Sequence, residues 1–136
     1  MKHWGIILGI LICPLLASAQ ESDSGMELTL PPIGYASVQD AYDSLSADEN
    51  ASKSEYEGWT LFTQKVDGKY ILWSFTPEYH PVHPSAVRRD IVKKDGEIFI
   101  SMSAMCYSSR LDCDQLIAQF QQINEGLKQK FADDPG

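Results

Sequence analysis

Four runs in the middle of the chain have the hydrophobic and polar composition of β-strands, and the last of them alternates apolar and polar side chains, the pattern produced by a β-strand with one buried face. The runs cover residues 56–66, 69–76, 87–94 and 97–106. Asp67-Gly68 separates the first two and Asp95-Gly96 the last two, and this dipeptide favours a tight hairpin because both turn positions need a positive φ. The sequence therefore predicts two β-hairpins that form a four-stranded antiparallel sheet.

A two-residue turn also fixes which side chains face each other across a hairpin. The predicted pairs include Phe62 with Trp73 and Ile91 with Ile100. The same register sets Arg89 opposite Met102 and places its guanidinium on an otherwise apolar face. We therefore expect either a bulge in this strand or a position at the sheet edge, where Arg89 can reach a carboxylate.

Helical spacing of apolar residues occurs on both sides of the hairpins. Ser37 is a predicted N-cap with Asp40 three residues later, and Ser109 is a second with Asp112 three residues later. The two apolar stripes comprise Val38, Ala41, Tyr42 and Leu45, and Cys113, Leu116, Ile117, Phe120, Ile123, Leu127 and Phe131. Polar residues 48–54 predict a loop. The order predicts an α+β fold of two layers, in which an N-terminal helix and a long C-terminal helix pack on one face of the sheet.

The first 19 residues are typical of a cleaved secretory signal. Lys2 and His3 precede an apolar run, and Ala17-Ser18-Ala19 provides the small residues that signal peptidase needs. The apolar stretch 4–16 is shorter than the ~20 residues that span a bilayer as a helix. We expect removal of residues 1–19, a periplasmic or secreted location, and no membrane insertion afterwards.

Charge and composition divide the remaining chain. Residues 20–57 hold nine acidic and one basic side chain, whereas residues 58–136 are nearly neutral. We interpret residues 20–35 as a flexible acidic arm, whose segment 26–30 lies along a sheet edge, and residues 36–136 as a single α+β domain. The net charge of −8 argues against nucleic acid as a partner, because that binding requires Lys and Arg to neutralise phosphates.

Cys106 and Cys113 are the two cysteines left once the leader, with Cys13, is removed. An even pair in an exported protein predicts a disulfide. A zinc half-site or a redox pair needs more ligands or the closer Cys-x-x-Cys spacing.

Residues 73–85 link the predicted hairpins and contain two His, three Pro and three aromatic residues. Proline fixes its own φ and restricts the residue before it, so we expect a rigid, preformed loop. Such a loop binds a partner without a large ordering cost. The basic residues beside it offer a cationic spot for an acidic protein. The predicted binding residues are Trp73, Phe75, Tyr79, His80, His83, Arg88 and Arg89.

Two chemical alternatives remain for the same loop. His80 and His83, with Glu78 as a third ligand, fit a zinc or copper site. His83 and Ser85 fit the base and nucleophile of a hydrolase, although no Gly-x-Ser-x-Gly turn or acidic partner accompanies them. In a purely structural interpretation, the aromatic residues pack over the sheet end and the histidines bind backbone groups.

The segment from Trp73 to Ser85 resembles a segment of small exported proteins of Gram-negative bacteria that have no assigned activity, and the similarity extends over residues 56–125. Some of these proteins carry a DnaJ-type chaperone label. His80-Pro81-Val82 and His83-Pro84-Ser85 lack the Asp of the His-Pro-Asp signature of J-domains, which are all helical. The resemblance implies an exported single domain of this shape and assigns no catalytic residue.

The sequence thus predicts an exported small binding module, such as an inhibitor, an immunity-type protein or an accessory protein, that contacts an unidentified protein through the loop. It predicts no catalytic residue and no cofactor. A small metal-binding protein that uses His80 and His83 is the alternative, followed by a hydrolase.

Overall fold

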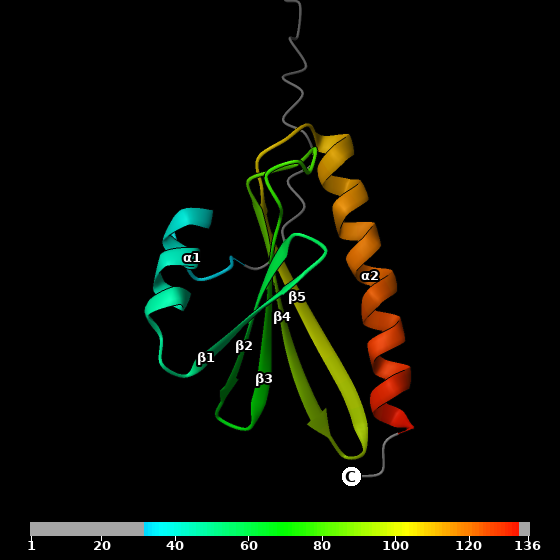
Figure 1. Cartoon of the computed structure of the whole chain (residues 1–136). Coiled ribbons are helices and arrows are strands. Elements are labelled where there is room, and N and C mark those ends of the chain that lie inside the picture. Colours follow the sequence, from blue (N-terminus) through cyan, green and yellow to red (C-terminus); the bar gives the residue numbers. More distant parts are fainter. Residues whose placement is uncertain (1–31, 134–136) are drawn as a thin grey trace, which may run out of the picture.

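The computed structural model describes residues 32–133, which form a five-stranded antiparallel meander with one helix on each face (Figure 1). The elements in chain order are α1 (Val38–Ala47), β1 (Ala51–Tyr56), β2 (Trp59–Val66), β3 (Lys69–Phe75), β4 (Ser85–Lys94), β5 (Glu97–Cys106) and α2 (Arg110–Ala132). The predicted signal peptide and the segment 26–30 lie outside the described residues. Within residues 32–133, no helix has both the length and the apolar character needed to cross a membrane.

The sheet has five strands, so the prediction of four strands was wrong. The additional strand β1 covers most of the predicted polar loop 48–54. A turn at Glu57 and Gly58, with φ values of 48° and 84°, separates it from β2 inside the predicted strand 56–66. Strand β1 lies at the sheet edge and is almost entirely exposed, so its polar sequence carries no alternation of buried and exposed positions.

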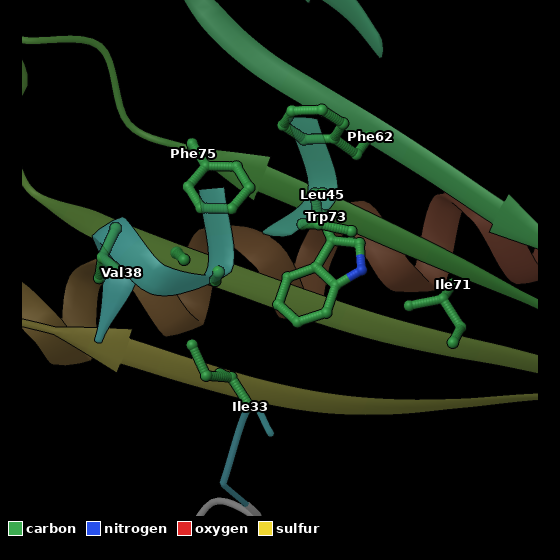
Figure 2. Close-up of a cluster of buried hydrophobic side chains, with 9 residues drawn as sticks. Ile33, Val38, Leu45, Phe62, Ile71, Trp73 and Phe75 are labelled. Atoms are coloured by element: carbon green, nitrogen blue, oxygen red, sulfur yellow. The ribbon is translucent and has the colours of Figure 1, made fainter. Parts of the chain in front are cut away.

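The two helices pack on opposite faces of the sheet, which corrects the prediction of two layers. Helix α1 buries its apolar side against β2 and β3, as Figure 2 shows. This cluster comprises Ile33, Val38, Ala41, Leu45, Phe62, Ile71, Trp73, Phe75 and Ala86. Helix α2 covers the other face, where Leu116 and Phe120 pack with Val82 and Val87. Successive strand residues point to opposite faces, so Ala86 and Val87 belong to different clusters.

Several local predictions are confirmed. Phe62 pairs with Trp73, and Ile91 pairs with Ile100. Ser37 and Ser109 cap the two helices by accepting hydrogen bonds from the backbone amides three residues later. Cys106 and Cys113 form a disulfide that ties the end of β5 to the first turns of α2.

The folded domain begins before residue 36, where the flexible arm was expected to end. Ile33 is 1% exposed and belongs to the α1-side core. Its carbonyl accepts a hydrogen bond from Arg88 Nη1, and the ring of Tyr35 packs on Trp73. At least residues 33–35 are therefore part of the folded domain.

Candidate functional site

Residues 76–84 connect β3 to β4 and are held by hydrogen bonds within the loop; we call them the β3–β4 loop. Thr76 and Ser85 close its base, because Thr76 N donates to Ser85 O and Ser85 N donates to Thr76 Oγ1. His80 N donates to Pro77 O and His83 N donates to His80 O, which forms two consecutive turns. These bonds, together with three prolines, agree with the expectation of a preformed loop.

Tyr79 is the one Phe, Tyr or Trp residue of this loop, and its side chain is exposed and yet fixed in position. Its side chain is 76% exposed, while its hydroxyl donates a 2.6 Å hydrogen bond to the carbonyl of Glu57 in the β1–β2 turn. Gly58 lies directly beneath the ring, since a Cβ there would stand 2.9 Å from the Tyr79 hydroxyl. The β1–β2 turn therefore supports the exposed face of the loop.

Trp73 and Phe75 were predicted as contact residues, but they are only 2% and 4% exposed. Both belong to the core beneath α1, with their rings stacked at 6.3 Å. Trp73 Nε1 donates to Gln64 Oε1, so its one polar atom is also satisfied inside the domain. Neither residue is available to a partner of the folded protein, and the predicted contact is reduced to the loop itself.

His80 and His83 lie on different sides of the β3–β4 loop. His83 Nδ1 is 2.9 Å from Thr76 O, and His80 Nδ1 accepts from Val82 N. His80 also packs edge-on against Trp59 at 5.1 Å. Within residues 32–133 no three His, Cys, Asp or Glu side chains gather into a metal-binding group. No observation therefore favours the metal-site hypothesis over the structural roles of the two rings.

The predicted base and nucleophile pair is not assembled. Ser85 is completely buried, and its hydroxyl donates to the carbonyl of Val82. The imidazole of His83 instead contacts both the carbonyl and the hydroxyl of Thr76. The hydrolase hypothesis therefore has no geometric support in this loop.

Arg88 and Arg89 point to opposite faces of β4 and do not form a common cationic spot. Arg88 lies on the α1 face and makes two hydrogen bonds to Asp90, of 2.7 and 2.9 Å, which raise the pKa of Arg88. Arg89 lies on the α2 face and is 7% exposed. It occupies an interior strand without a bulge, so both predictions for its placement were wrong. Burial lowers the pKa of Arg89.

The surface has two hollows beside the β3–β4 loop. The first, of about 540 Å³, lies between the loop and α1, and it includes His83 and the exposed Tyr107. The second, of about 730 Å³, lies between the β1–β2 hairpin and α2, and we call it the α2 hollow. His80 and Arg89 both line the α2 hollow, whereas His83 lines the other one.

No protein-family model matches the chain, and neither the curated proteins nor the solved structures contain a match. What the resemblance implied therefore stays a prediction.

Sequence reasoning missed two parts of this region. The Glu57-Gly58 turn that anchors Tyr79 was placed inside a strand, although a glycine in a strand pattern is a recognised signal of a bulge or turn. The sequence also provided no prediction of the α2 hollow. The one feature that pointed to it was Arg89, which is predicted on an otherwise apolar strand face.

Proposed function

We propose that this protein is an exported binding module that engages a protein partner through the β3–β4 loop, with Tyr79 as the central contact. The observation that carries the proposal is the combination of exposure and anchoring at Tyr79. Its ring is mostly in solvent, while its hydroxyl is bonded to Glu57 O. An aromatic side chain held in this way loses little further conformational entropy when a partner covers it.

The surroundings of Tyr79 also suit a protein contact. Tyr56, which precedes the β1–β2 turn, and Tyr107, which follows β5, are both mostly exposed. Tyr107 and the loop residues Pro77 and Glu78 line the same hollow. Tyrosines are enriched at protein interfaces because each offers a large apolar area and a polar tip.

Aromatic contact, and not charge, is the basis of the proposal. The acidic partner expected from the sequence depended on Arg88 or Arg89 forming a cationic spot with the two histidines. Arg88 is paired with Asp90, and Arg89 is buried on the other face. The partner is therefore proposed to present an apolar or aromatic patch.

Export is part of the same proposal. The leader at residues 1–19 supports it, and the Cys106–Cys113 disulfide is compatible with an oxidising compartment. Intact-mass measurement of the exported protein should give a chain that begins at Gln20 and lacks two hydrogens at the cysteine pair. A chain that retains residues 1–19 and two free thiols would contradict export.

Site-specific photocrosslinking tests the contact surface. A photoreactive amino acid replaces Tyr79 in the full-length chain expressed in its native host, and in a matched control it replaces Tyr70. Tyr70 is 44% exposed and lies at the opposite end of β3. We expect one discrete adduct from position 79 and none from position 70.

Competition decides whether the adduct is specific. Excess purified wild-type protein should suppress the adduct from position 79, and excess Tyr79→Ala protein should not. Equal adducts from both positions, or equal suppression by both competitors, would refute Tyr79 as the central contact.

A further inference from the structure

Arg89 is a buried cation for which the described residues provide no counter-charge. Its guanidinium makes one hydrogen bond within residues 32–133, from Nη2 to Ser74 Oγ at 3.3 Å. Its Nε is buried without a hydrogen-bond partner, and none of the ion pairs among these residues includes it. Burying an unpaired charge is costly, and buried charges in proteins are usually paired with an opposite charge. An unpaired buried cation therefore suggests an anionic ligand.

The α2 hollow places this guanidinium at the bottom of a site with apolar walls. The wall residues include Trp59 from β2 and Phe120 and Ile123 from α2. Phe120 also supports the cation directly, since its ring centre lies 5.0 Å from the Arg89 guanidinium carbon. The side chains of Ser74, His80, Gln119 and Gln122 add polar groups to the same lining.

We propose that the α2 hollow binds a small organic carboxylate with an apolar or aromatic body. The carboxylate pairs with the Arg89 guanidinium, whose planar fork matches its two oxygens. The apolar body lies against Trp59, Phe120 and Ile123. The hollow, at about 730 Å³, falls in the range of 300–1,000 Å³ that is usual for small-molecule sites. Tyr79 itself does not line the hollow, although its neighbours Tyr56 and Glu57 do, and carboxylate binding there does not depend on a protein partner at Tyr79.

The charge pattern of the hollow favours an anion over a neutral ligand. Arg89 is its one Lys or Arg side chain, and Glu57 is its one carboxylate. The Glu57 carboxylate makes no salt bridge to Arg89, and its residue is exposed at the rim. A monoanion therefore meets one cation at the bottom of the hollow and apolar walls above it.

Titration with matched probes tests the proposal. The probes are 3-phenylpropionate, its neutral isostere 3-phenylpropanamide, and inorganic phosphate, each added to the 15N-labelled mature protein in a buffer without other carboxylates. NMR signals of the Trp59 indole, the Gln119 and Gln122 amides and the Arg89 Nε–H report on the hollow. The Trp73 indole, which lies in the opposite core, is the internal reference. We expect 3-phenylpropionate to shift the first set saturably and to leave Trp73 unchanged.

Two variants distinguish the contribution of the Arg89 charge to binding from that of the apolar walls. Arg89→Gln should weaken binding of 3-phenylpropionate by about tenfold to a hundredfold, the range for loss of a charge-assisted hydrogen bond. The same variant should leave 3-phenylpropanamide affinity unchanged. Lys93→Gln, which removes an exposed cation from the same strand, should change neither affinity.

Three results would overturn the proposal. They are equal affinities of the wild-type protein for the acid and the amide, binding of phosphate alone, and an unchanged Arg89 Nε–H signal at saturating 3-phenylpropionate. Each is measured on the wild-type protein, so the test remains decisive even if Arg89→Gln does not fold.

Discussion

The guanidinium of Arg89 lies over the ring of Phe120, 5.0 Å from its centre, in the interior between the sheet and helix α2. A cation–π contact of this kind offsets part of the cost of burying the charge. It leaves the hydrogen-bonding capacity of the guanidinium largely unused, since the described residues contribute only the bond to Ser74. The protein therefore keeps a destabilising group in its core at the point where a hollow opens.

Replacement of this cation should not weaken the fold. Arg89→Met retains most of the apolar volume and removes the buried charge, so we expect an unchanged or higher free energy of unfolding in urea. Arg88→Met is the matched control and should cost about 1 kcal/mol, because it removes the bonds to Asp90 and to Ile33 O. A loss of more than about 2 kcal/mol in Arg89→Met would show that the free protein already pairs this charge.

The disulfide should contribute measurably to stability. Cys106 and Cys113 close a loop of eight residues, for which the chain-entropy estimate is about 2.5 kcal/mol. We expect the double variant Cys106→Ala/Cys113→Ala to lose roughly this amount in urea denaturation. Dithiothreitol should lower the midpoint of the wild-type protein and leave that of the variant unchanged; equal responses would contradict a structural role.

The Asp48 carboxylate should make the fold sensitive to acid. A hydrogen bond from the backbone amide of Asn50, followed by one from the Gln64 side chain, lowers the pKa of Asp48 below its usual value of 3.8. A carboxylate with a lowered pKa in the folded state stabilises fully above its unfolded pKa, and this stabilisation is lost as pH falls through the folded value. Asp48→Asn should therefore show a smaller loss of stability below about pH 4 than the wild-type protein.

Urea midpoints measured from pH 5 down to about pH 2.5 check this expectation. The exposed neighbour Glu49→Gln is the control and should follow the wild-type curve more closely than Asp48→Asn does. Identical slopes for the Asp48→Asn and wild-type proteins would mean that the two hydrogen bonds do not favour the ionised form.

Gln64 joins this carboxylate to the core. Its Nε2 donates to Asp48 Oδ2, and its Oε1 accepts from Trp73 Nε1. Gln64→Leu should leave the buried indole N–H without an acceptor and destabilise by about 1–3 kcal/mol. In an Asp48→Asn background, Gln64→Glu keeps an acceptor for Trp73 and faces an amide in place of the Asp48 carboxylate, so at neutral pH it should retain more of the stability than Gln64→Leu in the same background. The reverse order in urea denaturation would contradict the importance of this bond.

Local signals predicted much of the fold correctly. The Asp-Gly turns fixed the registers of two hairpins, and the two serine caps fixed the helix starts, because each feature depends on a few neighbouring residues. The side on which each helix packs depends on tertiary structure. One clue was available, since the nearly continuous apolar run at residues 70–75 is typical of a strand buried on both faces.

The candidate sites were harder to predict because each depends on residues far apart in the chain. Prolines indicated a rigid β3–β4 loop. The anchor of Tyr79, however, is the carbonyl of Glu57, which is 22 positions away in a turn that lies inside the predicted strand 56–66. Similarly, Arg89 was recognised as anomalous on an apolar strand face. Its buried environment is produced by α2, which packs over that face and is distant from Arg89 in the sequence.

Two glycines with nearly the same backbone conformation provide the sharpest test of the Tyr79 anchor. Gly58 has φ +84° and Gly68 has φ +79°, so an alanine at either position is strained by about 1 kcal/mol. A Cβ at Gly68 meets nothing within 4 Å, whereas a Cβ at Gly58 meets the Tyr79 hydroxyl at 2.9 Å and Pro77 at 3.3 Å. Gly58→Ala should therefore cost more than Gly68→Ala, because it also displaces Tyr79 from Glu57 O.

A double-mutant cycle isolates this additional cost. In a Tyr79→Ala background, Gly58→Ala should lose about 0.5–1.5 kcal/mol less than it does in the wild-type background, the net value of one hydrogen bond. The penalty of Gly68→Ala should be the same in both backgrounds.

The same two glycine variants test the partner contact when the photoreactive group replaces Glu78 in the β3–β4 loop. Because the β1–β2 turn holds the exposed ring, Gly58→Ala should weaken the photocrosslink from this position, while Gly68→Ala should not. Equal crosslinking in the two glycine variants would show that the partner contact does not depend on the anchoring of Tyr79.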